Sequence, residues 1–146
     1  MNKNELLISV VIPTYNSEEY IADALHSVIN QTYTNLEVLL VDDASIDETV
    51  AIVSKFISKD SRIFLEKLKV NSGAAIARNT AIKLAKGNCI AFLDADDQWR
   101  NDKISVQLGL IDSLGFKFIG SNSTRISYPS FQEYFKIKWQ VLPLKW

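Results

Sequence analysis

The chain of 146 residues is short of the residue types that build several common kinds of site. Its single cysteine, Cys89, excludes an intrachain disulfide, and its single histidine, His26, has no partners for a zinc site. No Gly-rich loop follows the first apolar run, which argues against a dinucleotide-binding fold. We read Cys89 as a small buried residue of a strand and His26 as an ordinary helix residue.

Membrane and targeting signals are also missing. No apolar run reaches the ~18–20 residues that a membrane span needs. Residues 1–5 lack the basic-then-apolar layout of a signal peptide, so a cytoplasmic location is the default expectation. The net charge of −1 gives no support for a nucleic-acid binder.

That small net charge hides a basic tail. The residues from Phe116 onward carry five bases and one acid, and segment 134–139 is both cationic and aromatic. One interpretation is peripheral contact with a membrane surface or a lipid-linked acceptor. We favour the other, a helix that packs against a further half of a larger protein.

Strand-like and helix-like patterns alternate along the chain, which is long enough for one domain with a substantial core. Strands are expected over Leu6–Ile12, Leu36–Val41, Arg62–Leu68, Cys89–Leu93 and Phe116–Gly120. Helices are expected after Ser17 as N-cap, after Ser45 or Asp47, over Ala74–Ala85 and over Ile104–Leu114. This alternation predicts an α/β fold with a mostly parallel sheet and helices on both faces, whose ligands bind where the strands end.

Three carboxylates, Asp94, Asp96 and Asp97, end the fourth of these strands. Since a strand delivers residues i and i+2 to one face, Asp94 and Asp96 point into one site. Uncompensated carboxylates this close raise one another's pKa, and oxygen ligands suit Mg²⁺ or Mn²⁺. Mg²⁺ is often held by one or two carboxylates plus substrate phosphates, so the motif predicts metal-assisted handling of a diphosphate. The competing interpretation is an Asp-rich turn that caps the next helix.

Five segments of the chain carry recognisable motifs. They are Val10–Asn16, Tyr20–Tyr33, Glu37–Asp47, Asn71–Asn79 and Phe92–Trp99. In this order and spacing they resemble the N-terminal part of the family 2 glycosyltransferases, over roughly Ser9 to Gln107. The resemblance implies the GT-A fold, a Rossmann-like arrangement that binds nucleotide sugars.

The resemblance also implies individual roles. Asp96 binds the metal, and Asp94 contacts the ribose or the metal. Asp43 accepts a hydrogen bond from the uracil edge, and Tyr15 offers an aromatic face to the base. Further contacts with the nucleotide come from Pro13, Thr14, Asn71 and Arg78.

Each of these roles has a structural alternative. Asp43 is otherwise a cap for the helix that follows Asp47, and Tyr15 is a rim aromatic packed on the sheet. Arg78 is otherwise a surface arginine paired with an acid. We read Asp42 as structural.

The chain departs from the family pattern in two ways. Ala44 and Ala81 stand where the family usually has glycine, and alanine tolerates positive φ poorly, so we expect a small perturbation of the turn after Asp43. Family members also continue well past residue 146, and Glu133 has the wrong surroundings for their catalytic carboxylate. We therefore expect residues 1–146 to form one donor-binding domain that ends before the acceptor-binding half, with residues 121–146 poorly determined and the general base beyond residue 146.

The sequence thus predicts the donor domain of an inverting glycosyltransferase of cell-surface polysaccharide biosynthesis. It would bind a nucleotide sugar, with UDP as the expected nucleotide, together with Mg²⁺ or Mn²⁺. The sugar would pass to a hydroxyl of a glycan or lipid-linked acceptor, and the chain alone would transfer it weakly or not at all. The alternative is a non-catalytic nucleotide-sugar-binding module. A phospho-acceptor receiver domain is disfavoured, because its paired acids follow the first strand.

Overall fold

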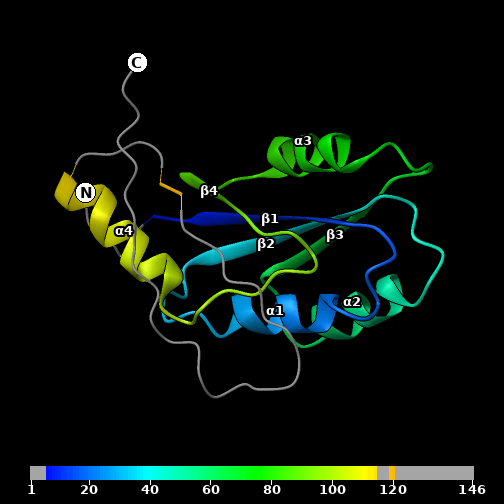
Figure 1. Ribbon diagram of the computed structural model, residues 1–146, viewed down its shortest axis with the longest axis horizontal. Coiled ribbons are helices and arrows are strands. Elements are labelled where there is room, and N and C mark those ends of the chain that lie inside the picture. Colours follow the sequence, from blue (N-terminus) through cyan, green and yellow to red (C-terminus); the bar gives the residue numbers. More distant parts are fainter. Residues whose placement is uncertain (1–5, 115–118, 121–146) are drawn as a thin grey trace. The chain divides into compact units, whose positions relative to one another are not determined.

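The computed structural model describes residues 6–114, 119 and 120. The chain falls into two compact units, residues 1–105 and 106–146, and each is considered by itself. The first unit is built on a four-stranded sheet, in which every neighbouring pair is parallel (Figure 1). The strands are β1 (Ile8–Thr14), β2 (Leu36–Asp42), β3 (Ile63–Lys67) and β4 (Cys89–Phe92), in the order β3-β2-β1-β4.

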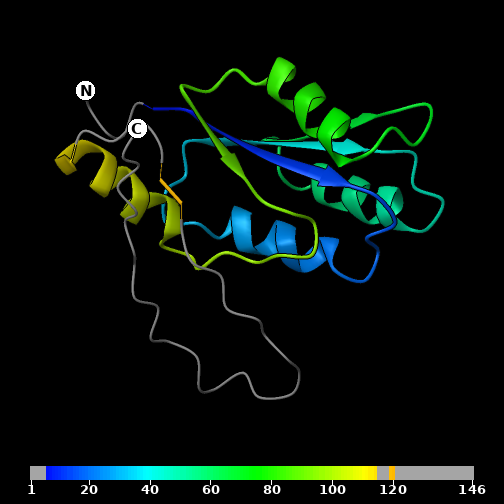
Figure 2. The ribbon, with the colours of Figure 1, turned by 45° about the horizontal axis from the view of Figure 1, so that its top comes forward.

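Helices cover both faces of this sheet (Figures 1 and 2). α1 (Ile21–Ile29) and α2 (Thr49–Ile57) lie on one face, and α3 (Ala74–Leu84) lies on the other. α4 (Lys103–Leu114) starts at the end of the first unit and supplies most of the described residues of the second. The predicted fold class, a parallel sheet between two helical layers, is confirmed. Among the described residues, no helix has both the length and the apolar character that crossing a bilayer demands.

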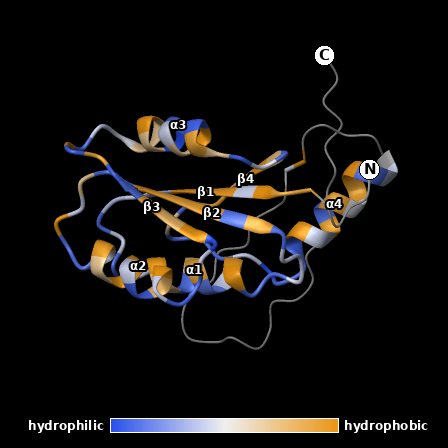
Figure 3. Cartoon of the chain, turned by 180° about the vertical axis from the view of Figure 1, so that it is seen from behind, coloured by the Kyte–Doolittle hydropathy of each residue, from blue (hydrophilic) through white to orange (hydrophobic). Residues whose placement is uncertain are grey.

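The core follows from the two central strands, which Figure 3 shows as mainly hydrophobic ribbons. Every residue of β1 and β2 is buried, the pattern expected of parallel strands covered on both faces. On the α3 side, Val11, Leu39 and Val41 pack with Ala77 and Ala81. The small side chains of α3 let this helix lie close to the sheet, and alanine at position 81 fits there fully buried.

At the amino end of the sheet, the buried carboxylate of Glu37 on β2 forms hydrogen bonds to β1 and to the segment before β4. Glu37 is 6% exposed, and its Oε1 accepts hydrogen bonds from the Ser9 hydroxyl at 2.6 Å and the Lys86 N–H at 2.7 Å. The Gly87 N–H donates to the Ser9 Oγ at 2.8 Å. A Cβ on Gly87 would lie 2.5 Å from that Oγ and 2.7 Å from the Leu7 carbonyl oxygen, so this approach requires glycine.

Some local expectations were wrong. Ser17 does not cap α1 with its side chain: the hydroxyl donates to the Tyr15 carbonyl, and the Ser17 carbonyl accepts the N–H groups of Tyr20 and Ile21. Cys89 is partly rather than fully buried, because β4 has only one neighbour, β1, among the described strands. The expected strand over 116–120 falls mostly, and the basic tail segment 134–139 entirely, outside the described residues.

The Gly87 contact generates a stability prediction. We expect Gly87→Ala to lower the free energy of unfolding by about 2 kcal/mol, because the added methyl group overpacks a hydrogen-bonded approach. Gly109→Ala is the matched control, because the helix around it leaves the methyl group open space, and we expect a gain of up to about 1 kcal/mol. Urea unfolding followed by circular dichroism measures both variants. Equal effects of the two substitutions would contradict the prediction.

Candidate functional site

The carboxyl ends of β1, β2 and β4 meet at one edge of the sheet, which we call the rim. Thr14 and Asp42, the last residues of β1 and β2, are register partners, and the Asp43 N–H donates to the Thr14 carbonyl at 2.8 Å. Beyond β4, the Leu93 N–H donates to the Val11 carbonyl at 3.1 Å, which carries the chain toward the rim. The chain segments that follow β1, β2 and β4 therefore lie at the same edge of the sheet.

Hydrogen bonds between side chains and backbone join the two loops that follow β1 and β2. The Asn16 N–H donates to the Ser45 Oγ at 2.9 Å, and the Asn16 Oδ1 accepts the Ile46 N–H at 3.0 Å. The Ser17 N–H donates to the Thr49 Oγ1 at 2.7 Å. Asn16 takes a φ of +45°, which asparagine tolerates better than most residues. The two loops therefore form one rigid part of the rim.

Asp47 was predicted as a cap of α2, but the N-cap is Glu48, which makes no side-chain capping bond, and Asp47 binds the first N–H of the helix from one residue earlier. Its Oδ1 accepts the Thr49 N–H at 3.0 Å, and its Oδ2 accepts the Glu18 N–H from the neighbouring loop at 3.1 Å. Burial alone would raise the pKa of Asp47, but these hydrogen bonds outweigh burial and hold the pKa below its ordinary value.

The turn after Asp43 keeps a left-handed residue despite its alanine. Ala44 has a φ of +62°, and the next N–H, from Ser45, donates to the Asp42 Oδ2 at 3.1 Å. The surrounding hydrogen bonds hold the alanine in a conformation that glycine adopts without strain. The expected perturbation is therefore strain in an unchanged left-handed turn.

Asp43 is buried and binds backbone in the segment before α3. It is 3% exposed, and its two carboxylate oxygens accept the N–H groups of Ser72 and Gly73 at 2.7 Å each. This places the predicted residue Asn71, which is exposed, directly beside Asp43. The structural alternative for Asp43, a cap on α2, does not hold, because both of its oxygens bind the segment before α3 and the N-cap of α2 is Glu48. A carboxylate has about four lone-pair sites, so Asp43 retains two for a ligand.

Two other predicted residues form an ion pair. The Arg78 guanidinium, on α3, donates to the Asp94 Oδ1, and both side chains remain partly exposed to solvent. The alternative of an arginine paired with an acid is therefore what the structure shows for Arg78, and its partner belongs to the predicted site. Asp94 keeps one carboxylate oxygen, Oδ2, without this partner.

Asp96 is the exposed member of the acidic motif, and within the described residues its carboxylate makes no hydrogen bond or ion pair. Burial, then the charges of Asp96 and Asp94, raise the pKa of Asp97 above its ordinary value. The pKa of Tyr20 is also raised, chiefly by its hydrogen bond to Glu19 and in small part by the charge of Asp96. Tyr20, the N-cap of α1, is 52% exposed and was not among the predicted site residues.

The described residues contain no group of three His, Cys, Asp or Glu side chains arranged to enclose a metal ion. An ion held by the protein alone does not fit this rim. An ion shared between one or two carboxylates and the phosphates of a ligand does fit, because Asp96 is exposed and its carboxylate is unpartnered.

Two buried polar atoms at the rim lack partners among the described residues: the Thr14 Oγ1 and the Asp42 Oδ1. Both residues are 2% exposed. The other Asp42 oxygen and its carbonyl bind the N–H groups of Ser45 and Leu68, so its structural role is confirmed. Of the remaining predicted contacts, Pro13 is buried in β1 and Tyr15 is 47% exposed just beyond it.

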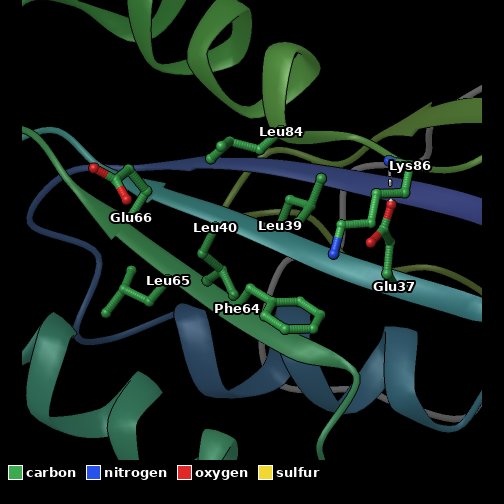
Figure 4. Close-up of a pocket in the computed structure, with 8 residues that line it drawn as sticks. All are labelled: Glu37, Leu39, Leu40, Phe64, Leu65, Glu66, Leu84 and Lys86. Atoms are coloured by element: carbon green, nitrogen blue, oxygen red, sulfur yellow. Dashed lines mark hydrogen bonds between the residues drawn. The ribbon is translucent and has the colours of Figure 1, made fainter.

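A groove of about 260 Å³ lies on the α3 side of β2 and β3, and Figure 4 shows its lining. The Lys86 ammonium lies 5.9 Å from the centre of the Phe64 ring there. None of the predicted site residues lines this groove, so the rim and the groove are separate features. The lining residues are Glu37, Leu39, Leu40, Phe64, Leu65, Glu66, Leu84 and Lys86.

Comparison with known proteins shows the family of the chain. The model of the family described as Glycosyl transferase family 2 matches residues 9–145. The chain belongs to glycosyltransferase family 2. Among curated relatives of this family 2 chain, a protein of Bacillus subtilis (strain 168), named putative teichuronic acid biosynthesis glycosyltransferase TuaG, is 44% identical over 116 residues, covering 78% of the chain and 46% of TuaG.

A second relative has a more specific name, UDP-Glc:alpha-D-GlcNAc-diphosphoundecaprenol beta-1,3-glucosyltransferase WfaP, from Escherichia coli. It is also 44% identical over 116 residues, covering 80% of this chain and 45% of WfaP. The family 2 chain thus spans less than half the length of the curated relatives it matches.

Solved structures of other glycosyltransferases share the fold. Residues 1–349 of S. aureus TarS in complex with UDP give a TM-score of 0.73 at 32% identity, covering 88% of this chain and 40% of that one. A mannosyltransferase from Pyrobaculum calidifontis, PcManGT, in complex with GDP-Man and Mn²⁺, gives a TM-score of 0.69 at 30% identity. The match covers 81% of this chain and 35% of PcManGT. The GT-A fold predicted for this family 2 chain is confirmed.

The left-handed alanine gives a prediction for this rim. We expect Ala44→Gly to raise the free energy of unfolding by about 0.5–1 kcal/mol, because relief of strain exceeds the added entropy of the unfolded chain. Ala51→Gly, in exposed α2, is the control and should lower it by about 1 kcal/mol. Thermal and urea unfolding measure both. A loss of stability in the Ala44 variant would show that the turn carries no strain.

The two hydrogen bonds that Asp47 accepts, from the N–H groups of Glu18 and Thr49, predict a pH-dependent contribution to stability. We expect Asp47→Asn to cost about 1 kcal/mol near pH 7, because one of two accepted N–H bonds is lost. Since the folded-state pKa lies below the ordinary 3.8, this contribution is present above 3.8 and is lost as pH falls through the folded value. The difference from the unaltered protein should therefore shrink in acid. Urea unfolding at several pH values measures it, with Glu48→Gln as the charge-matched neighbour. A difference that stays constant would refute the assignment.

Proposed function

We propose that this chain is the donor-binding domain of an inverting glycosyltransferase, which binds a nucleotide sugar at the rim with a divalent metal ion. The observation that carries the proposal is the convergence of Asp43, Arg78, Asp94 and Asp96 on one sheet edge of a family 2 chain. The intact enzyme transfers the sugar to an acceptor hydroxyl. We assign the general base to none of the described residues, so we expect the chain alone to bind the donor with weak or absent transfer.

Asp96 is the proposed metal ligand, with Mg²⁺ or Mn²⁺ as the ion. Support comes from its exposed, unpartnered carboxylate and from the Mn²⁺ in the PcManGT structure. When bound, the ion acts as a Lewis acid that offsets charge developing on the departing diphosphate. Asp94 offers its remaining oxygen to the ribose or to the same ion, and Arg78 keeps that carboxylate oriented.

The nucleotide occupies the rim between β1, β2 and the start of α3. Tyr15 offers an aromatic face to the base, and Asp43 accepts an imide N–H with the lone pairs that Ser72 and Gly73 leave unused. Pro13, Thr14 and Asn71 add backbone and side-chain contacts. The UDP in the TarS complex supports uracil as the base, whereas the GDP-Man in PcManGT makes guanine the competing choice.

The acceptor is proposed to be a glycan or a lipid-linked sugar. Support comes from the names of two relatives, one in teichuronic acid biosynthesis and one acting on an undecaprenol-linked sugar diphosphate. Such a role in cell-surface polysaccharide biosynthesis fits a cytoplasmic enzyme with peripheral membrane contact. A non-catalytic nucleotide-sugar-binding module remains the alternative, and transfer by the full-length gene product would exclude it.

Calorimetry tests the donor site. We expect UDP to bind the chain more tightly with Mn²⁺ than without it, and GDP to bind more weakly. Asp96→Asn should abolish the gain from Mn²⁺ while leaving the unfolding curve unchanged, because the side chain holds no other group.

Glu66→Gln is the matched control, because it removes one exposed carboxylate from β3 and should leave the metal dependence intact. Equal or absent binding of UDP and GDP, unaffected by metal, would refute the proposed function. Metal-dependent binding that survives Asp96→Asn would refute the role of that residue alone.

A further inference from the structure

The segment that follows the acidic motif runs alongside α1, although the two are about 70 residues apart in sequence. Figure 2 shows the yellow-green chain between β4 and α4 passing beside the blue helix α1. Two hydrogen bonds join this segment to α1 and to the residues that follow it. The Gln98 amide donates to the Asp23 carboxylate at 3.4 Å, and three residues later the Asn101 carbonyl accepts the Thr32 N–H at 2.7 Å. α1 therefore acts as a support for this segment.

The strongest point of this contact is the side chain of Gln31, just past the end of α1. It is 4% exposed, and its amide bridges two elements. The Nε2 donates to the Ser27 carbonyl at 3.0 Å and to the Arg100 carbonyl at 2.6 Å, while the Oε1 accepts the Ile104 N–H at 3.1 Å. Both donors of the amide are used, so the group has one orientation.

The acids of the rim lie between two fixed points. On one side, the Leu93 N–H binds the Val11 carbonyl at the end of β4. On the other side, Gln31 holds Arg100 and Ile104. Between these points the Asp96 carboxylate makes no hydrogen bond or ion pair with the described residues, so its place at the rim depends on how the chain on either side of it is held.

We infer that Gln31 is a positioning residue for Asp96: its buried amide holds the segment after the acids against α1 and so fixes the metal-binding carboxylate at the rim. This inference rests on the proposed function. Buried groups that orient a metal ligand through the backbone affect metal affinity although they never touch the ion. None of the hydrogen bonds of the Gln31 side chain involves β2 or α3, so its loss should weaken the metal-dependent part of binding and spare the rest.

The variant Gln31→Glu tests the inference with little change of volume. It retains an acceptor for the Ile104 N–H but turns a carboxylate oxygen toward the carbonyls of Ser27 and Arg100. We expect Mn²⁺-dependent UDP binding to weaken about tenfold, with UDP binding in the presence of a chelator unchanged. Amide hydrogen exchange over residues 96–104 should become faster, because the segment loses the bonds from Gln31 to Arg100 and Ile104 and keeps only those from Asp23 and Thr32.

Two further variants separate positioning from general destabilisation. Gln31→Met keeps the size of the side chain without a charge and should act in the same direction, which covers the case of a charged variant that fails to fold. Glu37→Gln alters the buried hydrogen bonds at the opposite end of the sheet. It should lower the free energy of unfolding without changing the gain in UDP affinity from Mn²⁺.

The outcomes are distinguishable. If the unaltered chain shows no Mn²⁺-dependent binding, the proposed function falls and this inference falls with it. If the unaltered chain shows that binding and both Gln31 variants keep it, only the inference is overturned. A uniform loss of UDP affinity with and without Mn²⁺, matched by Glu37→Gln, would show that Gln31 acts on stability alone.

Discussion

The complete burial of β1 and β2 is the constraint on which the rest of the structure depends. A strand covered on both faces has little room for charge, because an unpaired ion in the core costs several kcal/mol. Charged groups on these strands are therefore confined to their ends. Glu37 near the amino end of β2 and Asp42 at its carboxyl end are each buried and hydrogen-bonded to backbone. Acidic residues are therefore found at the rim, because the buried interior of β1 and β2 excludes unpaired charge.

Hydrogen bonding divides these acids into two groups. Asp42, Asp43 and Asp47 each accept backbone N–H groups that the loops would otherwise leave unsatisfied, so their charges stabilise the fold. The carboxylates of Asp94 and Asp96 accept no backbone N–H among the described residues, and both side chains remain exposed. Carboxylates of the second group add little to stability. They are therefore the acids of the rim that are open to a ligand.

The sequence predicted elements whose cause is local, and it missed contacts whose cause is distant. Apolar runs and helical spacing located all four described strands and the helices, and the strand ends located the rim. The capping hydroxyl of Ser17 was wrong because the hydroxyl instead satisfies a nearer carbonyl, that of Tyr15. The backbone bonds of Asp43 and the bridge made by Gln31 join residues 29 to 73 positions apart, which no local pattern reveals. The departure at Ala44 was visible in the sequence, but only the surrounding hydrogen bonds show that the left-handed turn survives it.

Charge balance at the rim explains why the acidic motif suits a divalent ion together with a diphosphate. Arg78 neutralises Asp94 within an ion pair, which leaves Asp96 and Asp97 as the uncompensated charges of the motif. Burial, followed by the nearby charges of Asp96 and Asp94, raises the pKa of Asp97. A diphosphate entering this field alone would be repelled, and a divalent ion entering alone would find too few ligands. Together they would satisfy each other, which is the electrostatic reason for expecting the proposed nucleotide binding to depend on the metal.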